Sequence, residues 1–362
     1  MYFQEFLYSR FANPNRTELE NALADLERAT YGLAFASGMA ATTAIFHLLK
    51  ANDHVICGHD CYGGTHTFFE DIAANMSIHV SFIDATNASA IAAAIRPKTA
   101  MIWLESPSNP LLNIVDIQRI ARLVRNFETH GHRDITLVID NTFATSYFQK
   151  PLELGASISY QSLSKYINGH GDVMAGGLVT NDAYLASRLK HLQKTLGGTP
   201  SPFDCYLVKR GLETFGLRMR AHYTNALAIA RFLEQHPKIR KVLHPGLDTH
   251  PGHVIARRQC YAFSGVVSCY LNISDSTVEN SDYETVSDVV VKFSQTLKLF
   301  KLAVSLGNTR SLIEIPSLMT HKDVDAKHLQ TLGIDHTLVR LSIGIEPITD
   351  LIADLKQALT VL

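Results

Sequence analysis

Short runs of apolar and β-branched residues alternate with longer helical stretches through the first half of this chain. The runs that favour strands are His54–Cys57, His79–Ile83, Met101–Leu104, Ile135–Asp140 and Ile158–Ser162. Amphipathic stretches, such as the one that begins at Asp116, separate one run from the next. This alternation predicts an α/β fold with a mostly parallel sheet and helices on both faces.

The second half of the chain has a different pattern. The 362 residues exceed the length at which one hydrophobic core usually stops growing. Strands at Gly265–Leu271 and Leu338–Ile343 mix with helices there. We therefore expect residues 1–215 to form a large domain with a short N-terminal segment, and residues 216–362 to form a smaller C-terminal α+β domain.

The first helix has a recognisable start signal. Thr17 and Glu20 have the spacing of a capping box, in which each side chain accepts a hydrogen bond from the other residue's backbone N–H. Gly32 follows as a residue that commonly ends helices. The pattern predicts a helix that begins at Thr17 and ends before Gly32.

Composition excludes several classes of function. The net charge of −1 gives no general attraction to nucleic acid or to anionic membranes. No run of about 18 apolar residues is present that could span a bilayer. The cysteines are odd in number and include no C-x-x-C pair, which argues against a disulfide framework and a zinc site: Cys57, Cys61, Cys205, Cys260 and Cys269. We expect a cytoplasmic protein that binds a small molecule and no metal.

Polar residues end two of the predicted strands. The run at 137–139 leads into Asp140 and Thr142, and the run at 158–161 leads into Ser162 and Lys165. Because ligands bind outside the carboxyl ends of parallel strands, these residues are candidates for a site. A carboxylate and an amine at one sheet edge could equally form an ordinary ion pair.

A third element favours a ligand site over an ion pair. Ser37, Gly38 and Met39 lie in a turn that leads into a helix, where free backbone N–H groups and the helix dipole favour a phosphate. A phosphate cradle, a carboxylate and an amine together match what pyridoxal 5′-phosphate (PLP) requires: an anchor for its phosphate, a partner for its pyridine nitrogen and a Schiff-base lysine.

The same residues belong to motifs that extend along the whole chain. These motifs are Tyr8-Ser9-Arg10, Ser37-Gly38-Met39-Ala40, Tyr62-Gly63-Gly64-Thr65, Glu105-Ser106-Pro107-Ser108-Asn109-Pro110, Asp140-Asn141-Thr142-Phe143, Ser162-Leu163-Ser164-Lys165-Tyr166, Ser305-Leu306-Gly307 and Arg340-Leu341-Ser342. In them the chain resembles the Cys/Met metabolism PLP-dependent enzymes, the transsulfuration family. The resemblance implies the fold type I of PLP-dependent transferases, with an aspartate aminotransferase-like large domain.

The resemblance assigns catalytic roles to three residues. Lys165 would hold the cofactor as a Schiff base and carry substrate protons, and Asp140 would keep the pyridine nitrogen protonated. Tyr62 would stack on the pyridine ring and act as an acid or base near the leaving group. A transaminase on the same fold, or a protein that binds PLP without catalysis, would be the alternatives outside this chemistry.

The resemblance also implies the remaining contacts to the cofactor. Backbone amides and hydroxyls of Gly38, Met39, Ser162 and Ser164 would hold the phosphate, Asn109 would contact the ring oxygen, and Thr142 would also bind the cofactor. Tyr8 and Arg10 would reach the phosphate of the neighbouring subunit. The site would therefore be shared between subunits of a dimer, and two dimers would form a homotetramer.

The resemblance places the substrate in the C-terminal part of the chain. Arg340, with the Ser305 region, would bind the α-carboxylate, although an ordinary strand arginine is the other interpretation of Arg340. The expected reaction is γ-elimination of L-cystathionine to cysteine, 2-oxobutanoate and ammonia, in cysteine biosynthesis and methionine metabolism. Cystathionine γ-synthase or homoserine-ester sulfhydrylase activity comes next, followed by cystathionine β-lyase and methionine γ-lyase activity.

Two positions depart from the pattern of cystathionine enzymes. Thr67 stands where an arginine usually meets the distal end of the substrate, and Arg310 stands where a glutamate is usual. Our hypothesis is that Arg310 takes over recognition of the distal charge. Otherwise the pocket would favour a homoserine ester or a smaller sulfur amino acid.

Overall fold

The computed structural model describes residues 6–129, 134–273, 285–322 and 326–362. The chain forms two compact units. Unit 1 comprises Met1–Asn109, Asn113–Gly216 and Arg257–Tyr261, and unit 2 comprises Pro110–Leu112, Leu217–Ala256 and Ala262–Leu362. The division at Gly216 falls within the long helix α10 (Phe215–Glu234).

A seven-stranded sheet forms the centre of unit 1, in the order β1-β7-β6-β5-β4-β2-β3. Its strands are β1 (Tyr31–Phe35), β2 (His54–Gly58), β3 (His79–Ile83), β4 (Thr99–Glu105), β5 (Thr136–Asp140), β6 (Ile158–Ser162) and β7 (Gly176–Thr180). Strands β3, β2, β4, β5 and β6 run parallel to one another, whereas β7 runs antiparallel to β1 and β6. The predicted mostly parallel sheet is confirmed.

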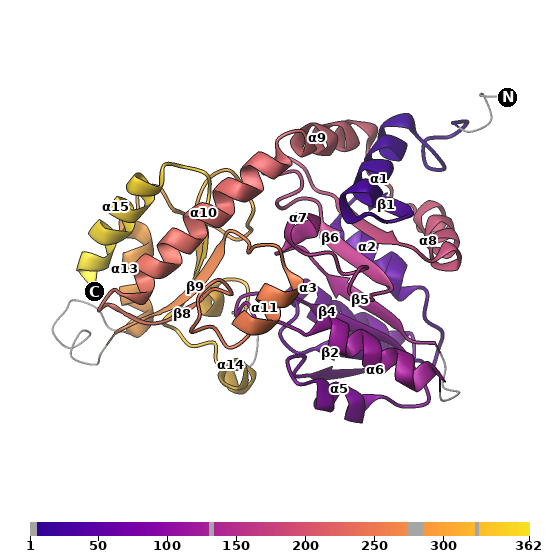
Figure 1. Ribbon diagram of the computed structural model, residues 1–362, viewed down its shortest axis with the longest axis horizontal. Coiled ribbons are helices and arrows are strands. Elements are labelled where there is room, and N and C mark those ends of the chain that lie inside the picture. The colour runs from indigo at the N-terminus through magenta and orange to yellow at the C-terminus, as the bar shows by residue number, and fades with distance from the viewer. Residues whose placement is uncertain (1–5, 130–133, 274–284, 323–325) are drawn as a thin grey trace. The chain divides into compact units, whose positions relative to one another are not determined.

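Helices cover both faces of this sheet (Figure 1). Helices α2 (Gly38–Phe46) and α8 (Ala183–Leu196) bury apolar residues against one face, together with Trp103. Helices α5 (Ala88–Ala94) and α6 (Ile117–Thr129) do the same on the other face. Since β4 is buried along its whole length, its sequence is a continuous apolar run instead of an alternating one.

The first helix, α1 (Pro14–Glu27), begins before the predicted capping box. Its N-cap is Asn13, whose side chain accepts a hydrogen bond from the Asn15 N–H, and proline occupies the first helical position. The predicted start at Thr17 is therefore wrong. The Asn-Pro pair supplies both a cap and a preset φ angle, so it starts the helix one turn earlier.

Glycines explain why the sequence did not reveal β1 and β7. Gly32 lies in β1, where an added Cβ would be 2.1 Å from the Glu20 carbonyl oxygen of α1. Gly176 opens β7, and there a Cβ would be 2.3 Å from the Ser37 carbonyl oxygen. These glycines allow close backbone approach, although glycine is unfavourable in strands and is typical of helix ends and turns.

Unit 2 has a five-stranded sheet in the order β10-β11-β12-β9-β8. Its strands are β8 (Ile239–Leu243), β9 (Val266–Leu271), β10 (Lys301–Leu302), β11 (Leu312–Glu314) and β12 (Leu338–Ser342). Most neighbours are antiparallel, and β10 runs parallel to β11. The apolar residues of the sheet pack against α10, α13 (Val286–Thr296) and α15 (Ile348–Ala358), which form the core of this α+β unit.

The remaining helical segments complete the two units. They are α3 (Gly63–Thr67), η2 (Phe68–Ile72), α4 (Ala73–Asn75), α7 (Thr145–Phe148), α9 (Pro202–Leu212), α11 (His253–Gln259), η3 (Pro316–Leu318), α14 (Ala326–Leu332) and η4 (Leu359–Val361). Across the described ranges, none of the helices is both long enough and apolar enough to cross a membrane.

Candidate active site

Three ionisable side chains lie in a row near the carboxyl edge of the unit 1 sheet: Glu105 and Asp140 end their strands, and Tyr160 lies two residues before the end of β6. In register, Glu105 of β4 lies beside Asp140 of β5, which lies beside Tyr160 of β6. Because partners in a parallel pair point to the same face, all three side chains lie on one face of the sheet. All three are buried. This row forms the floor of the candidate site.

Asp140 is the central residue of this row. Its carboxylate accepts a hydrogen bond from the Thr142 N–H at 2.9 Å. Burial raises the pKa of Asp140 to about 6, against the lowering effect of its hydrogen bonds to Thr142. Among the residues that the structure describes, Asp140 has no salt bridge. An ionised Asp140 therefore needs a positive charge from a ligand.

The predicted phosphate turn lies directly against this row. Ser37 is the N-cap of α2, and its hydroxyl accepts a hydrogen bond from the Ala40 N–H at 3.0 Å. Gly38 is the first helical residue, and an added Cβ would be 2.6 Å from the Tyr160 hydroxyl oxygen. Since Met39 follows within the same first helical turn, the backbone N–H groups predicted to hold a phosphate open onto the sheet edge.

Lys165 follows β6 by three residues and is half-buried, and its backbone N–H donates to the Ser162 carbonyl at 3.3 Å. Ser162 connects this loop to Asp140's strand, because its N–H donates to the Thr142 hydroxyl at 2.9 Å. The Ser164 hydroxyl donates to the Ala175 carbonyl at 3.2 Å, so in this structure it holds the loop. Unit 1 thus brings Lys165, Asp140, Thr142 and Ser162 to one edge.

Tyr62 enters the site from the loop after β2. It is the N-cap residue of α3, its side chain is 47% exposed, and its N–H donates to Glu105 Oε2 at 2.8 Å. Its ring lies over Gly64, where an added Cβ would be 2.6 Å from Cε1 of the ring. The second glycine of Tyr-Gly-Gly-Thr therefore gives the tyrosine ring room in this position.

Three further predicted cofactor residues lie in unit 1. Asn109 is buried four residues beyond the end of β4. Tyr8 is 56% exposed, and the Arg10 guanidinium lies 5.2 Å from its ring centroid while donating to the Lys194 carbonyl at 2.6 Å. The contact with another subunit that the sequence predicts for Tyr8 and Arg10 stays a prediction.

The predicted substrate residues lie in unit 2. Arg340 of β12 is 2% exposed, and its register partner on β11 is Glu314, whose Oε2 is 2.5 Å from Arg340 Nη2. The same Nη2 donates to the Ser305 carbonyl at 2.7 Å. Ser305 has φ of 98°, which is unusual for a residue with a side chain and is typical of functional sites. Arg310 lies on the surface of unit 2.

Glu105 is a residue of the candidate site that sequence reasoning missed. It contacts Tyr62 and neighbours Asp140, yet it appeared in the sequence only as the first letter of a motif. The signal that identified Asp140, a carboxylate at the end of an apolar strand, applies equally to Glu105, which follows Met101–Leu104. The predicted strand ended one residue too early to include it.

The residues at this edge fit PLP in two respects. The row of buried acids contains a carboxylate that no cation of the described chain neutralises, which is the requirement of a protonated pyridine nitrogen. The turn at Gly38 offers backbone N–H groups for a phosphate, and a side chain at that position would strike Tyr160. In the described parts of the chain, no cluster of three His, Cys, Asp or Glu side chains could hold a metal ion.

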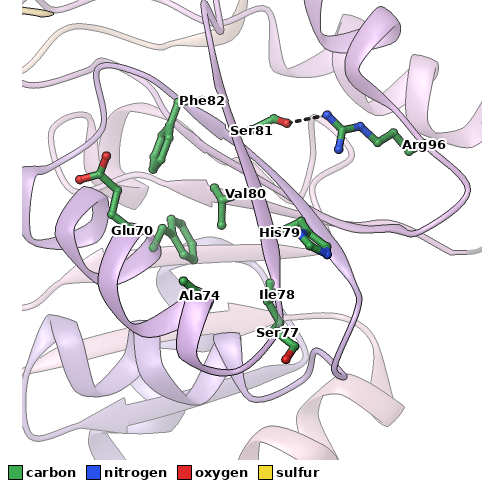
Figure 2. Close-up of a pocket in the computed structure, with 10 residues that line it drawn as sticks. Glu70, Ala74, Ser77, Ile78, His79, Val80, Ser81, Phe82 and Arg96 are labelled. Carbon is green, nitrogen blue, oxygen red and sulfur yellow. Dashed lines mark hydrogen bonds between the residues drawn. The ribbon is translucent and has the colours of Figure 1, made fainter.

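A cavity of about 720 Å³ lies elsewhere in unit 1, beside the edge strand β3 (Figure 2). Figure 2 shows Glu70 and Arg96 on opposite sides of this strand, with Arg96 hydrogen-bonded to Ser81. The lining residues are Phe69, Glu70, Ala74, Ser77, Ile78, His79, Val80, Ser81, Phe82 and Arg96. They include none of the predicted site residues, so this cavity is separate from the candidate active site.

Comparison with known proteins identifies the family of the chain. The sequence model of the Cys/Met metabolism PLP-dependent enzyme family matches residues 2–360. The chain is 47% identical over 354 residues to the cystathionine gamma-lyase of Rattus norvegicus, covering 98% of this chain and 85% of that protein. It is 46% identical over 355 residues to the cystathionine gamma-lyase of Dictyostelium discoideum, covering 98% of this chain and 87% of that protein.

Two solved structures are also similar. The crystal structure of cystathionine gamma-lyase from Lactobacillus plantarum complexed with L-serine has a TM-score of 0.90 and 39% identity, covering 98% of this chain and 88% of that one. The crystal structure of metB from Corynebacterium glutamicum has a TM-score of 0.89 and 42% identity, covering 98% and 86%. The predicted fold type I is confirmed, and the chain belongs to the Cys/Met metabolism PLP-dependent enzymes.

Proposed function

We propose that this protein is a cystathionine γ-lyase, which with one water converts L-cystathionine to cysteine, 2-oxobutanoate and ammonia. The observation that carries the proposal is the similarity to cystathionine γ-lyases along 98% of the chain. The edge of the unit 1 sheet supports it, because the buried carboxylate of Asp140, the loop that carries Lys165 and the predicted phosphate turn lie there. The family and the residues agree on PLP as the cofactor.

Each residue of the edge then has a chemical task. PLP, when bound, supplies an electron sink that stabilises negative charge on substrate carbon atoms. Lys165 holds the cofactor and moves protons between the carbon atoms of the substrate. Asp140 keeps the pyridine nitrogen protonated, which requires an ionised carboxylate. Tyr62 covers the ring, and its hydroxyl transfers a proton at the departing sulfur.

The substrate-binding part of the proposal concerns unit 2. Arg340 is assigned to the substrate α-carboxylate, with Ser305 beside it, and Glu314 fixes the guanidinium in position. Arg310 is assigned to the distal charge of cystathionine, since Thr67 cannot supply one. Its exposure on unit 2 leaves its guanidinium accessible. Replacing Arg310 by Ala should raise KM for cystathionine, and an unchanged KM would contradict this assignment.

We also propose that the enzyme is a dimer of dimers in the cytoplasm. Tyr8 and Arg10 are assigned to the phosphate of the neighbouring subunit, and the exposure of Tyr8 supports this. All five cysteines are free in this structure, as expected for a reducing compartment. Light scattering should give a tetramer mass, and a monomer with full PLP occupancy would contradict the shared site.

Product analysis tests the proposed reaction. The PLP-reconstituted protein should convert L-cystathionine to cysteine and 2-oxobutanoate. Homocysteine and pyruvate would identify a β-lyase instead. Condensation of a homoserine ester with cysteine or sulfide would identify a γ-synthase or a sulfhydrylase, and methanethiol from methionine would identify a methionine γ-lyase. Bound PLP without turnover of any of these substrates would indicate a protein that has lost catalysis.

A further inference from the structure

Glu105 connects two residues of the cofactor site. Its Oε2 accepts the Tyr62 N–H at 2.8 Å, which fixes the start of α3 and hence the position of the tyrosine ring. Its register partner on β5 is Asp140, and both side chains lie on the same face of the sheet. The buried carboxyl group of Glu105 is thus hydrogen-bonded to Tyr62, which is assigned to the face of the cofactor ring. It is also adjacent to Asp140, which is assigned to the ring nitrogen.

Within the part of the chain that the structure describes, the ionisable groups that act on Glu105 are all acids. Asp140 faces it from β5 and Tyr160 from β6, while Asp60 and Cys61 face it from the loop after β2. Burial raises the pKa of Glu105 well above its usual range, and the charge of Asp140 raises it further. The Tyr62 N–H acts in the opposite direction, because it stabilises the carboxylate.

Two adjacent buried carboxyl groups do not both ionise when no cation lies between them. Hydrogen bonds from both the hydroxyl and the N–H of Thr142 stabilise an ionised Asp140, whereas Glu105 has one such bond, from the Tyr62 N–H, so Asp140 loses its proton before Glu105 does. This order matters for the cofactor. A charged Glu105 would make Asp140 harder to ionise, and Asp140 would then lose its hold on a protonated pyridine nitrogen at neutral pH.

We propose that Glu105 is a positioning residue that remains a neutral carboxylic acid, holds Tyr62 over the cofactor ring, and leaves the carboxylate charge of the site on Asp140. This inference rests on the PLP dependence within the proposed function, and is independent of which sulfur amino acid is the substrate. It assigns to Glu105 two effects on PLP binding, one through a hydrogen bond to Tyr62 and one through its lack of charge.

Two variants separate these effects. Glu105→Gln keeps an oxygen that can accept the Tyr62 N–H and can carry no charge, whereas Glu105→Ala leaves that N–H without its acceptor. We would measure the dissociation constant of PLP by absorbance from pH 5 to pH 8, without substrate. Glu105→Gln should bind PLP like the wild type, and Glu105→Ala should bind it about 10-fold more weakly.

The pH profile gives the sharper result. Wild-type affinity for PLP should decline as pH falls through about 6, because Asp140 becomes protonated. In Glu105→Gln the midpoint of this decline should stay at the wild-type pH, since a neutral residue replaces a neutral residue. A midpoint that moves down by about one pH unit or more would mean that Glu105 was charged, and would overturn the inference.

Glu27→Gln is the matched control, because Glu27 is also a buried carboxyl in unit 1 and hydrogen-bonds to Ser146 instead of to a site residue. It should leave PLP affinity unchanged. Equal weakening by Glu105→Gln and Glu105→Ala, or no weakening by either, would also overturn the inference. A wild-type protein that binds no PLP would overturn the proposed function with it, whereas PLP binding without cystathionine cleavage would overturn only the proposed function.

Discussion

The two units treat a buried charge in opposite ways. In unit 1, Asp140 lies in a row of acids and has no salt bridge within the described chain, so burial raises its pKa to about 6. In unit 2, Arg340 is as deeply buried, but Glu314 lies 2.5 Å from it on the adjacent strand. One site lacks a counter-charge and the other contains one.

This difference indicates how each site meets its ligand. A buried carboxylate without a cation is costly, and a pyridinium removes that cost when it binds. A buried ion pair is complete without a ligand, so its arginine is fixed in place before a substrate arrives. Unit 1 therefore has a buried carboxylate that favours binding of a cation. Unit 2 has an arginine that is already oriented to bind an anion.

Removing the counter-charge in unit 2 should have the largest effect. Glu314→Ala leaves the Arg340 guanidinium buried without its carboxylate, which should lower the free energy of unfolding by about 3–5 kcal/mol. Urea unfolding monitored by circular dichroism would measure this. In the double variant with Arg340→Met, most of the loss should be recovered. A loss equal to that of the single variant would contradict the role of an unpaired charge.

Neutralising the carboxylate of Asp140 in unit 1 should have a slightly smaller effect. This effect should be on kcat and not on the free energy of unfolding. Asp140→Asn removes the charge that the ring nitrogen requires, so kcat should fall about 10²–10³-fold. Folding should be intact, because a buried charge without a salt bridge has been replaced by a neutral amide. Retained kcat with weakened folding would place Asp140 in a structural role and would remove the contrast with unit 2.

A third buried acid gives the smallest expected effect. Burial raises the pKa of Glu27 to about 7, although Ser146 and Lys150 oppose this. A carboxyl group whose pKa is raised by folding stabilises the folded state at pH values below its pKa in the unfolded chain. This stabilisation is lost as pH rises through its pKa in the folded state. Wild-type stability should therefore fall by up to about 3 kcal/mol between pH 5 and pH 8. Glu27→Gln should flatten the profile, and an unchanged profile would contradict this account.

Sequence patterns predicted the elements that are continuous in apolar residues. The parallel strands β2, β4 and β5 were recognisable because burial on both faces makes them largely runs of apolar residues. The pattern missed β1 and β7, whose glycines allow close backbone contacts. It also misplaced the start of α1, because a capping box at Thr17 competed with a stronger Asn-Pro signal.

The site was partly predictable for a similar reason. Asp140 and Lys165 follow apolar strands, and chain order alone indicates that such residues meet at one sheet edge. The pairing of Arg340 with Glu314 depends on the register between β11 and β12, which no local pattern reveals. The contact of Glu105 with Tyr62 likewise depends on how the loop after β2 folds back over the sheet edge.

The most direct test of the account is to locate the lysine that carries the cofactor. The PLP-loaded protein would be reduced with borohydride, which converts the link between cofactor and lysine to a stable amine, then digested and analysed by mass spectrometry. The account predicts the label on the peptide that contains Lys165, and its loss in Lys165→Ala. A label on another lysine, or none at all, would contradict the assignment of the unit 1 sheet edge as the PLP site.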